Sequence, residues 1–445
     1  MLISDFKQLE CIVKPVNIYN LYHFRGIEGF SIDSRKISKG YCFIALKGSR
    51  ADGHNFISEA VRKGASCIIA ERYLPHRPKT AFFVVEDSFA CLRSLIKFIR
   101  RIKRPFIFAI TGSVGKSTTK EMLSFLIEDK YPHIKNIGTE NNIFGVAKTM
   151  FALRNEKTVI IELGTNSPGE IGDLASITTP DVGIITAIKP VHLEKFKSLR
   201  GIFNEKISLI RSHNAIIPVL NSNDRYLGKV NSKKALWFGS SFDSNVYARL
   251  VRRNCKESVF KVCNKYRLNM PFVYEGFINN VLAALLAASI KKLEIKDLVC
   301  KMNNFKGYLE SRMQFVRKGR FIVINDAYNA NPYSFKQALS ILKQFPNPKA
   351  AVIGDMLELG NKSIYYHKLL SGDIIKSGVM SCLAVGKYTQ FLKGELKNKG
   401  FRNFTHFKKL KDMAKCIDRK FPEGTVIFLK GSRAMQLDKI IKYLK

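Results

Sequence analysis

Short apolar runs alternate with helix-length segments along most of the chain after residue 104. The runs at residues 106–110, 158–162, 182–187 and 215–220 are rich in β-branched residues and nearly continuous. Strands that are buried on both faces have this pattern. Because segments of helix length separate the runs, the pattern predicts a parallel sheet wound by helices.

A second alternation of the same kind begins near residue 314. It predicts strands at residues 320–325, 349–354, 381–386 and 425–430, and helices at about 334–344, 362–377, 409–420 and 435–444. The segment before residue 104 instead mixes short strands and turns, and it ends in a strand at 82–86 and a helix at 89–101.

These changes of pattern predict an α/β protein of three domains. We expect a small N-terminal α/β domain at residues 1–103, a central parallel-sheet domain at 104–313 and a C-terminal Rossmann-like α/β domain at 314–445.

Composition fits ordinary cores in a reducing compartment. The hydrophobic fraction of 46% is that of a normal globular protein. The first 20 residues carry Asp5, Glu10 and Lys14, which does not fit a secretory leader. The longest apolar run, at 281–290, is too short to span a bilayer and indicates a buried helix. Nine cysteines without CxxC pairs indicate neither a zinc site nor a disulfide framework, and we expect a cytoplasmic protein without stable membrane insertion.

The charge balance is unusual, with 74 Lys and Arg against 36 Asp and Glu, a formal net charge of +38. Such an excess fits a nucleic-acid or membrane partner. It also fits lysines spread over a solvated surface. Basic pairs occur throughout the chain without a run of five or six like charges, which favours the second interpretation and no nucleic-acid partner.

The strongest chemical motif is the string ITGSVGKST at residues 110–118, between a predicted strand and a helix-compatible stretch at 120–127. Glycines allow successive backbone N–H groups to point at phosphate oxygens, and the helix N-terminus adds partial positive charge. Lys116 can then neutralise β- and γ-phosphates, and the Ser117 hydroxyl can bind Mg²⁺. The alternative is a glycine-rich turn with a surface lysine. The order of strand, loop and helix favours a phosphate loop.

Glu162 ends the predicted strand at 158–162, which follows the phosphate loop in the chain. The carboxyl ends of parallel strands meet at one edge of a sheet. A carboxylate there can hold Mg²⁺ against nucleotide phosphates. Without the phosphate loop, the same residue would be an ordinary acid meeting solvent.

Further motifs fall in order along the chain. They are SIDSRK at 31–36, GYCFIALKG at 40–48, DGHNF at 52–56, GTENNIFG at 138–145, IELGTNSPGEI at 161–171, HLEKF at 192–196, NDAYNANP at 325–332, GDMLELG at 354–360 and LKGSR at 429–433. With the phosphate loop, they make the whole chain resemble the Mur ligase family. The strings at 328–332 and 354–360 are similar to its branch that adds D-alanyl-D-alanine.

The resemblance implies an ATP- and Mg²⁺-dependent ligase of peptidoglycan synthesis. Its partners would be a UDP-muramoyl-tripeptide and D-alanyl-D-alanine, joined through an acyl phosphate, and we expect it to act as a monomer. The third peptide residue, lysine or diaminopimelate, stays open.

The resemblance also implies roles for single residues. Those implied to bind ATP are Thr111, Gly112, Ser113, Val114, Gly115, Lys116, Ser117, Thr118, Asn279, Arg312, Asp326 and Asn329. Those implied to bind the other substrates are Ser31, Asp33, Ser34, Arg35, Asn141, Asn142, Asn331 and Asp355. The resemblance implies that the N-terminal domain, with the first four of these residues, holds the uridine nucleotide of the UDP-substrate. The implied metal ligands are Ser117, Glu162, His192 and Lys206, the last as a carbamate, and the implied catalytic residues are Lys116, His192, Lys206 and Arg312. A partly buried lysine suits carbamylation because only its neutral amine attacks CO₂.

Several positions depart from the family's pattern. Ser311 stands where a glycine normally precedes the arginine, Asn325 replaces an acid and Ile278 replaces a histidine. Ala187 and Ser208 replace Asn and Glu. These departures put the adenine and domain-interface contacts in doubt and leave the reaction class intact.

Two other functions remain possible. One is another member of the same superfamily, such as the ligase adding the third muropeptide residue or a folylpolyglutamate synthase, against which the strings at 329–332 and 354–360 argue. The other is a basic nucleic-acid-binding NTPase, which would require clustered Lys and Arg or aromatic stacking motifs.

Overall fold

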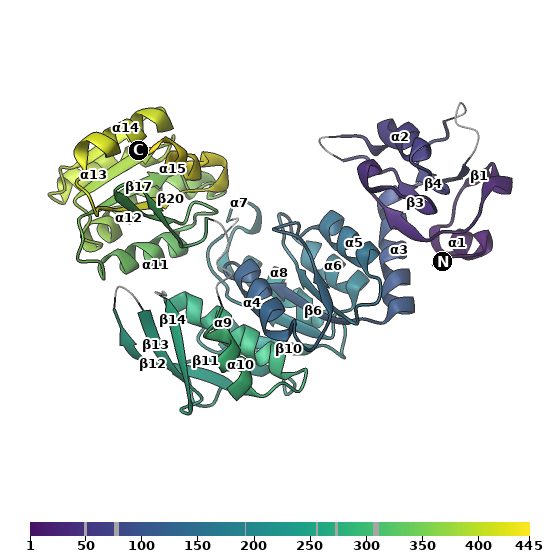
Figure 1. Ribbon diagram of the computed structural model, residues 1–445, viewed down its shortest axis with the longest axis horizontal. Helices are drawn as coiled ribbons and strands as arrows, with labels where there is room; N and C mark the ends of the chain where they lie inside the picture. The colour runs from purple at the N-terminus through teal and green to yellow at the C-terminus, as the bar shows by residue number, and fades with distance from the viewer. Residues whose placement is uncertain (49–50, 75–79, 192, 255–256, 272–274, 306–310) are drawn as a thin grey trace.

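The computed structural model describes residues 1–445 except 49–50, 75–79, 192, 255–256, 272–274 and 306–310. It contains three sheets, and each lies in one of the three ranges expected for the domains. Figure 1 shows them as separate bodies, with the N-terminal and C-terminal domains on different sides of the central one. The predicted three-domain α/β fold is confirmed.

The N-terminal domain is a five-stranded sheet in the order β1-β5-β4-β3-β2, parallel except for β1. Its elements are α1 (Phe6–Val13), β1 (Asn17–Tyr19), β2 (Gly29–Ser31), β3 (Tyr41–Ile44), α2 (Ile57–Arg62), β4 (Cys67–Ala70), β5 (Ala81–Val84) and α3 (Ser88–Lys103). The long helix α3 packs against α1 and also against two helices of the central domain, α5 and α6. It therefore joins the cores of the two domains.

The central domain holds a nine-stranded sheet in the order β14-β13-β12-β11-β10-β9-β6-β8-β7. Its strands are β6 (Phe106–Thr111), β7 (His133–Lys135), β8 (Thr158–Glu162), β9 (Val182–Ile185), β10 (Ile217–Asn221), β11 (Leu236–Gly239), β12 (Val246–Arg253), β13 (Glu257–Val262) and β14 (Tyr266–Pro271). Its helices are α4 (Lys116–Ile127), α5 (Ile143–Ala152), α6 (Glu170–Thr178), α7 (Leu193–Phe196), α8 (Leu199–Arg211), α9 (Glu275–Ser289) and α10 (Ile295–Met302).

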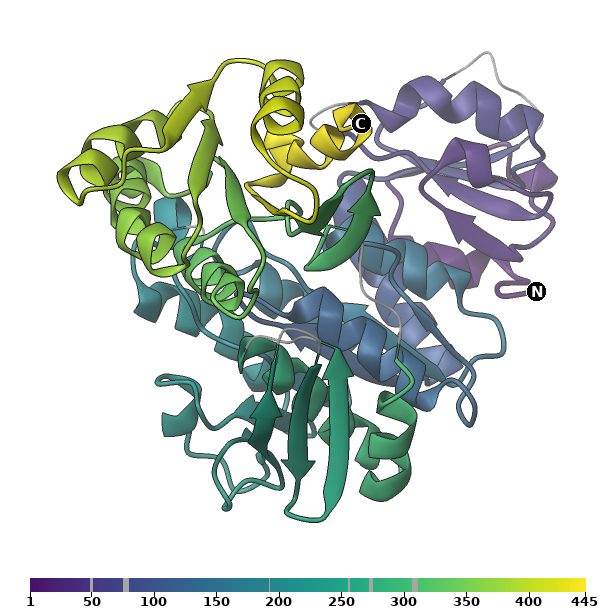
Figure 2. The ribbon, with the colours of Figure 1, turned by 60° about the vertical axis from the view of Figure 1, so that its left-hand side comes forward.

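The central sheet is parallel from β7 to β12, as the sequence predicts, and then continues as an antiparallel ribbon, β12–β14. The ribbon lies at the end of the sheet far from the N-terminal domain (Figures 1 and 2). Helix α9 contains the apolar run at 281–288 and packs against α4 and β10–β12 with those side chains buried. A helix that is apolar on all sides is expected to be buried in this way.

The C-terminal domain is a six-stranded sheet in the order β15-β16-β20-β17-β18-β19, in which only the β15–β16 pair is antiparallel. Its strands are β15 (Gln314–Lys318), β16 (Phe321–Asn325), β17 (Lys349–Gly354), β18 (Ser381–Val385), β19 (Phe404–Phe407) and β20 (Val426–Lys430). Its helices are α11 (Pro332–Leu342), α12 (Ser363–Lys376), α13 (Leu392–Asn398), α14 (Leu410–Lys420) and α15 (Ile440–Tyr443).

One predicted helix is wrong. Residues 435–444 form parts of two 3₁₀ turns, Arg433–Met435 and Leu437–Lys439, followed by the single turn of α15. Gln436 has φ of 51°, a left-handed conformation that ends a right-handed helix. None of the helices in the described ranges combines the length and apolar character that crossing a bilayer requires.

Candidate active site

The phosphate loop connects β6 to α4, and two of its glycines are required by its geometry. Gly112 has φ of +146° and Gly115 has φ of +88° at the N-cap of α4. A Cβ on Gly112 would lie 2.0 Å from Thr186 Oγ1, and one on Gly115 would lie 2.1 Å from Asn280 Oδ1. Only glycine fits both the backbone conformation and the space.

Neighbouring strand ends hold the loop in place. The Thr186 hydroxyl, after β9, donates to the Val114 carbonyl at 2.5 Å, and Ser113 Oγ donates to the Lys189 carbonyl at 2.9 Å. Ser113 Oγ also accepts the Lys189 N–H at 2.9 Å. The loop is thus shaped by fixed partners before any nucleotide binds, as a phosphate cradle requires.

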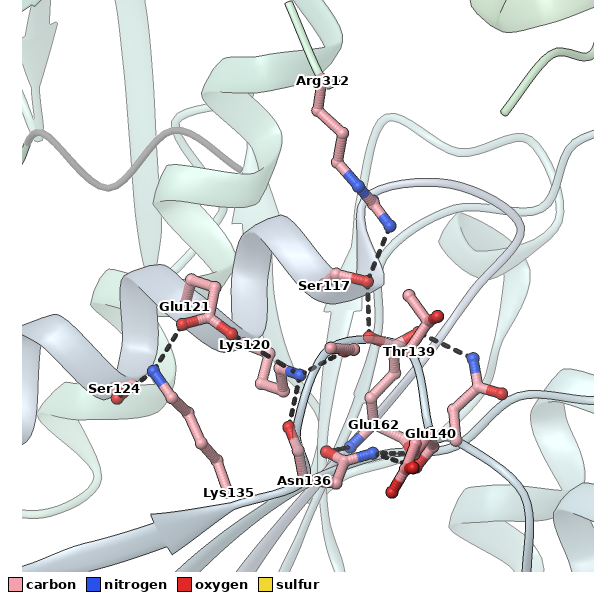
Figure 3. A network of polar contacts seen from close by, with 12 residues as sticks. Ser117, Lys120, Glu121, Ser124, Lys135, Asn136, Thr139, Glu140, Glu162 and Arg312 are labelled. Carbon is pink, nitrogen blue, oxygen red and sulfur yellow. Dashed lines mark hydrogen bonds and ion pairs between the residues drawn. The ribbon is translucent and has the colours of Figure 1, made fainter. Parts of the chain in front are cut away.

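Ser117, in the first turn of α4, meets Glu162 at the end of β8. The Ser117 hydroxyl donates to Glu162 Oε2 at 2.6 Å (Figure 3). Asn141 Nδ2 donates to Glu162 Oε1 at 2.9 Å. Asn136 fixes the strand end, because its Oδ1 accepts the Glu162 N–H at 2.9 Å. Among the described residues, no group of three or more His, Cys, Asp or Glu side chains could hold a metal. A hydroxyl and one carboxylate nevertheless fit Mg²⁺, which takes few protein ligands and completes its shell with phosphate oxygens and water.

Two lysines line the cleft beside this pair, of which Lys116 is partly buried and Lys206 is buried. The Lys116 amine donates to the Gly112 carbonyl at 2.9 Å, and burial lowers its pKa, with Glu162 acting in the opposite direction. Lys206, on α8, is 3% exposed and lines the same cleft. Burial, together with the charge of Lys116, lowers the pKa of Lys206 to about 7. No hydrogen bond or ion pair is found for its amine within the described residues, so the amine is free to react.

The C-terminal domain completes the cleft. Arg312 lies just before the expected start of this domain at residue 314, but the residues on either side of it are bonded to the domain: the Met313 N–H donates to Asp326, and the Ser311 carbonyl accepts the Tyr328 N–H. Arg312 Nη2 donates to Ser117 Oγ at 3.0 Å, which brings a second-domain guanidinium to the phosphate loop (Figure 3). The guanidinium also lies over the Tyr328 ring, 4.1 Å from its centroid. The Tyr328 hydroxyl in turn donates to Thr139 Oγ1 at 2.6 Å. The two domains therefore meet across the nucleotide loop.

The resulting cleft has a volume of about 1110 Å³. Of the predicted site residues, it is lined by Gly112, Ser113, Val114, Gly115, Lys116, Ser117, Thr118, Asn141, Glu162, Lys206, Asn279, Arg312, Asp326, Asn329 and Asn331. Thr111 lies directly behind the loop, with its hydroxyl donating to the Leu163 carbonyl at 2.9 Å. His192 lies outside the described residues.

Other predicted residues are not brought to the cleft. Asn142 caps α5, where its Oδ1 accepts the Gly145 N–H at 3.2 Å. Asp355 is buried after β17, and its carboxylate accepts backbone N–H groups from Lys387, Tyr388 and Thr389 at 2.7 to 2.9 Å. The Asn142 Oδ1 and the Asp355 carboxylate are thus engaged in protein hydrogen bonds, and a role of either residue in substrate binding stays a prediction.

We expect Asp355→Asn to destabilise the protein by about 2 kcal/mol without changing substrate affinity. The amide keeps one acceptor oxygen but places an NH₂ group against backbone donors. Thermal unfolding measures the first effect, and KM values measured below the melting temperature measure the second. A raised KM for D-alanyl-D-alanine with unchanged stability would restore Asp355 to the substrate site.

The four residues predicted to hold the nucleotide of the larger substrate lie in the N-terminal domain, away from the cleft lining. Ser31 Oγ accepts the Asp33 N–H at 3.0 Å, and Ser34 Oγ donates to Glu59 Oε2 at 2.7 Å. Arg35 pairs with Asp33 at 2.9 Å, and this hydrogen-bonded pair lowers the pKa of Asp33. They lie at the end of β2 and in the 3₁₀ turn that follows it, and their role in binding stays a prediction.

The structure also contains functional neighbours that the sequence did not single out. Asn280 packs against Gly115, one residue after the predicted contact Asn279. Lys120 is buried on α4, where its amine donates to the carbonyls of Asn136 and Gly138 at 2.7 and 2.8 Å (Figure 3). A lysine two residues after the phosphate-loop motif, in the helix that the motif opens, was the available signal for Lys120.

Two departures from the family's pattern prove to be partners. Asn325 Nδ2 donates to Ser311 Oγ at 3.1 Å, and both side chains are buried. Ser311 and Met313, on either side of Arg312, have φ of 58° and 52°. Such left-handed backbone costs about 1 kcal/mol or more per non-glycine residue, so surrounding contacts must hold this segment.

The parallel sheet, the phosphate loop and the arginine from a second α/β domain together define a phosphate-loop enzyme whose nucleotide site is shared between two domains. Comparisons with known proteins agree. The chain matches the "Mur ligase family, catalytic domain" at residues 26–86, the "Mur ligase middle domain" at 110–288 and the "Mur ligase, glutamate ligase domain" at 311–433.

Similar proteins cover nearly the whole chain. The UDP-N-acetylmuramoyl-tripeptide–D-alanyl-D-alanine ligase of Rickettsia prowazekii is 33% identical over 92% of this chain and 94% of its own length. The crystal structure of MurF from Acinetobacter baumannii has a TM-score of 0.88 at 26% identity, covering 98% of both chains. MurF from Thermotoga maritima in complex with ADP has a TM-score of 0.82 at 25% identity, covering 93% of this chain and 96% of its own. The chain belongs to the Mur ligase family.

Proposed function

We propose that this chain is the ATP-dependent ligase that joins D-alanyl-D-alanine to a UDP-N-acetylmuramoyl-tripeptide. The observation that carries the proposal is the meeting of Arg312 with Ser117, because it puts a second-domain cation on the phosphate loop beside Glu162 and Lys206. The ligases of Rickettsia prowazekii and Bacillus subtilis with this named activity match 92% and 100% of the chain.

The reaction has two steps. The bond between the γ-phosphorus of ATP and the ADP oxygen breaks while a carboxylate oxygen of the tripeptide bonds to that phosphorus, giving an acyl phosphate and ADP. The amine of D-alanyl-D-alanine then attacks the acyl carbon, loses a proton, and phosphate leaves. Phosphoryl transfer requires positioning and neutralisation of negative charge more than covalent chemistry from the protein.

The residues of the cleft suit these needs. Lys116 and Arg312 approach the phosphate loop from two domains and supply positive charge for the transferring phosphoryl group. Ser117 and Glu162 would hold Mg²⁺, which neutralises phosphate oxygens as a Lewis acid. Closure of the two domains excludes water that would otherwise hydrolyse the acyl phosphate.

Lys206 is the residue we propose to be carbamylated. Its lowered pKa supplies the neutral amine that attacks CO₂, and its buried amine has room in the cleft. The product is an anion, which can lie near a metal where an ammonium would be repelled. An anion at this position also offsets the charge of Lys116.

Replacing Asp326 with alanine should lower ligation about 10²-fold while leaving the KM for the UDP-substrate nearly unchanged. Asp326 lies in the C-terminal domain and its Oδ1 accepts the Met313 N–H at 3.1 Å, next to Arg312. Ser34 and Arg35 lie in a different domain. Steady-state kinetics with each substrate varied in turn test whether the C-terminal domain serves catalysis while the N-terminal domain binds the UDP-substrate. A variant that ligates at the wild-type rate, or that loses affinity for the UDP-substrate, would contradict this assignment.

The acyl phosphate itself can be trapped. Without D-alanyl-D-alanine, hydroxylamine should convert it to a hydroxamate of the tripeptide, with one ADP released for each hydroxamate. Mass spectrometry detects the product, and the control omits ATP. Release of ADP without hydroxamate would mean that water, not the carboxylate, receives the phosphoryl group.

A further inference from the structure

Lys430, the last residue of β20, carries a buried charge to which the mechanism above gives no role. Its side chain is 1% exposed, yet it borders the nucleotide cleft. Its amine donates to Asp326 Oδ2 at 2.5 Å and to the Asn329 carbonyl at 3.1 Å, and it lies 5.5 Å from the centroid of the Phe335 ring. A buried ammonium is costly unless it is paired and hydrogen-bonded, and this one is both.

The contacts of Asp326 extend from Lys430 to the segment that carries Arg312. Asp326 Oδ1 accepts the Met313 N–H, while its Oδ2 accepts from Lys430. Met313 directly follows Arg312, whose guanidinium reaches Ser117. One carboxylate therefore connects the end of β20 to the peptide that carries the arginine of the phosphate site.

The peptide around Arg312 needs such support. Ser311 and Met313 both hold left-handed backbone, a strained state that neighbouring contacts must maintain. On one side, Ser311 is held by Asn325, and its carbonyl accepts the Tyr328 N–H at 3.0 Å. On the other side, the contact of Met313 is with Asp326, which is paired with Lys430.

We propose that Lys430 is a positioning residue for ATP use: it fixes the carboxylate of Asp326 and, through it, the backbone that aims Arg312 at the phosphate loop. Lys430 acts through Asp326 and does not itself receive the phosphoryl group. The expected change in kcat rests on the proposed function. The expected change in nucleotide affinity does not, because it is independent of which carboxylate and amine the enzyme joins.

The test uses Lys430→Met, which removes the charge and keeps the length of the side chain. We expect ADP affinity, measured by titration calorimetry, to fall about tenfold, and kcat for ligation to fall more than the KM for the UDP-substrate rises. Lys439→Met is the matched control, because Lys439 is exposed in the same segment and bonds only to Gln436 among the described residues. Lys439→Met should bind ADP like the wild type.

A purely structural lysine would give a different result. If Lys430→Met lowers the melting temperature but binds ADP and turns over as the wild type does below that temperature, the proposal is overturned. Should the single variant not fold, Asp326→Asn combined with Lys430→Met removes the unpaired charge. The double variant should then bind ADP no more weakly than Asp326→Asn alone, because Lys430 acts through Asp326. A double variant that binds ADP more weakly than Asp326→Asn, or as tightly as the wild type, would contradict the proposal. Loss of ADP affinity in Lys430→Met with no ligation by the wild type would refute the proposed function alone.

Discussion

Lys116→Met should lower kcat for ATP-dependent ligation by about 10³-fold, with a smaller effect on the KM for ATP. The Lys116 amine lies in the phosphate loop and lines the cleft with Ser117 and Glu162, where a charge interacts strongly with a transferring phosphoryl group. Methionine keeps the apolar stem and removes the charge. Steady-state kinetics with a coupled ADP assay measures the effect.

The control for this variant is Lys130→Met, an exposed lysine just beyond the end of the same helix, α4. It should leave kcat and KM unchanged, and both variants should unfold at nearly the temperature of the wild type. If kcat of Lys116→Met decreased less than tenfold, Arg312 and the metal would neutralise the phosphoryl charge without Lys116.

Ligation should depend on dissolved CO₂ and fall as the pH drops below 7, because carbamate forms only from the neutral amine of Lys206. With the pKa of Lys206 lowered to about 7, roughly half of the amines are neutral at that pH, whereas an ordinary lysine with a pKa of 10.5 would be almost fully protonated. Lys206→Met should lower kcat about 10²-fold or more, since it removes the carbamate anion that we propose for the metal site.

Carbon-13 NMR in ¹³C-bicarbonate checks the modification directly. The wild type should show a carbamate resonance that is absent from Lys206→Met, and its intensity should rise between pH 6 and 8 together with the activity. Activity that is unaffected by removing CO₂, in a protein without this resonance, would show that Lys206 works as a free amine.

Much of the fold could be predicted from the sequence because many of its strands are short, nearly continuous apolar runs. The runs at 106–110 and 158–162 are β6 and β8, and 349–354 is β17. The ribbon β12–β14 was missed because its strands are partly exposed and carry many charges: Val246–Arg253 is buried at Val246 and Ala248 and mostly exposed after them. A half-exposed strand in a basic chain has a weaker pattern than a buried parallel one.

The candidate site divides in the same way. The phosphate loop could be predicted because the end of a strand, two glycines, a lysine and the start of a helix follow one another within residues 110–118. The partner of Arg312 could not, since Ser117 lies 195 positions away and only the fold brings them together. Asp355 shows the converse: a residue inside a diagnostic string can serve the backbone, here N–H groups more than 30 positions along the chain.

This protein should couple the cleavage of one ATP to ADP and phosphate to the formation of one amide bond. The most direct measurement combines ATP, Mg²⁺, UDP-N-acetylmuramoyl-tripeptide and D-alanyl-D-alanine with the purified protein, and quantifies ADP and the pentapeptide product by mass spectrometry. We predict one ADP for each UDP-N-acetylmuramoyl-pentapeptide. No pentapeptide should form when either UDP-N-acetylmuramoyl-tripeptide or D-alanyl-D-alanine is omitted. Release of ADP without pentapeptide, or ATP turnover that requires DNA or RNA instead of the two substrates, would contradict the account.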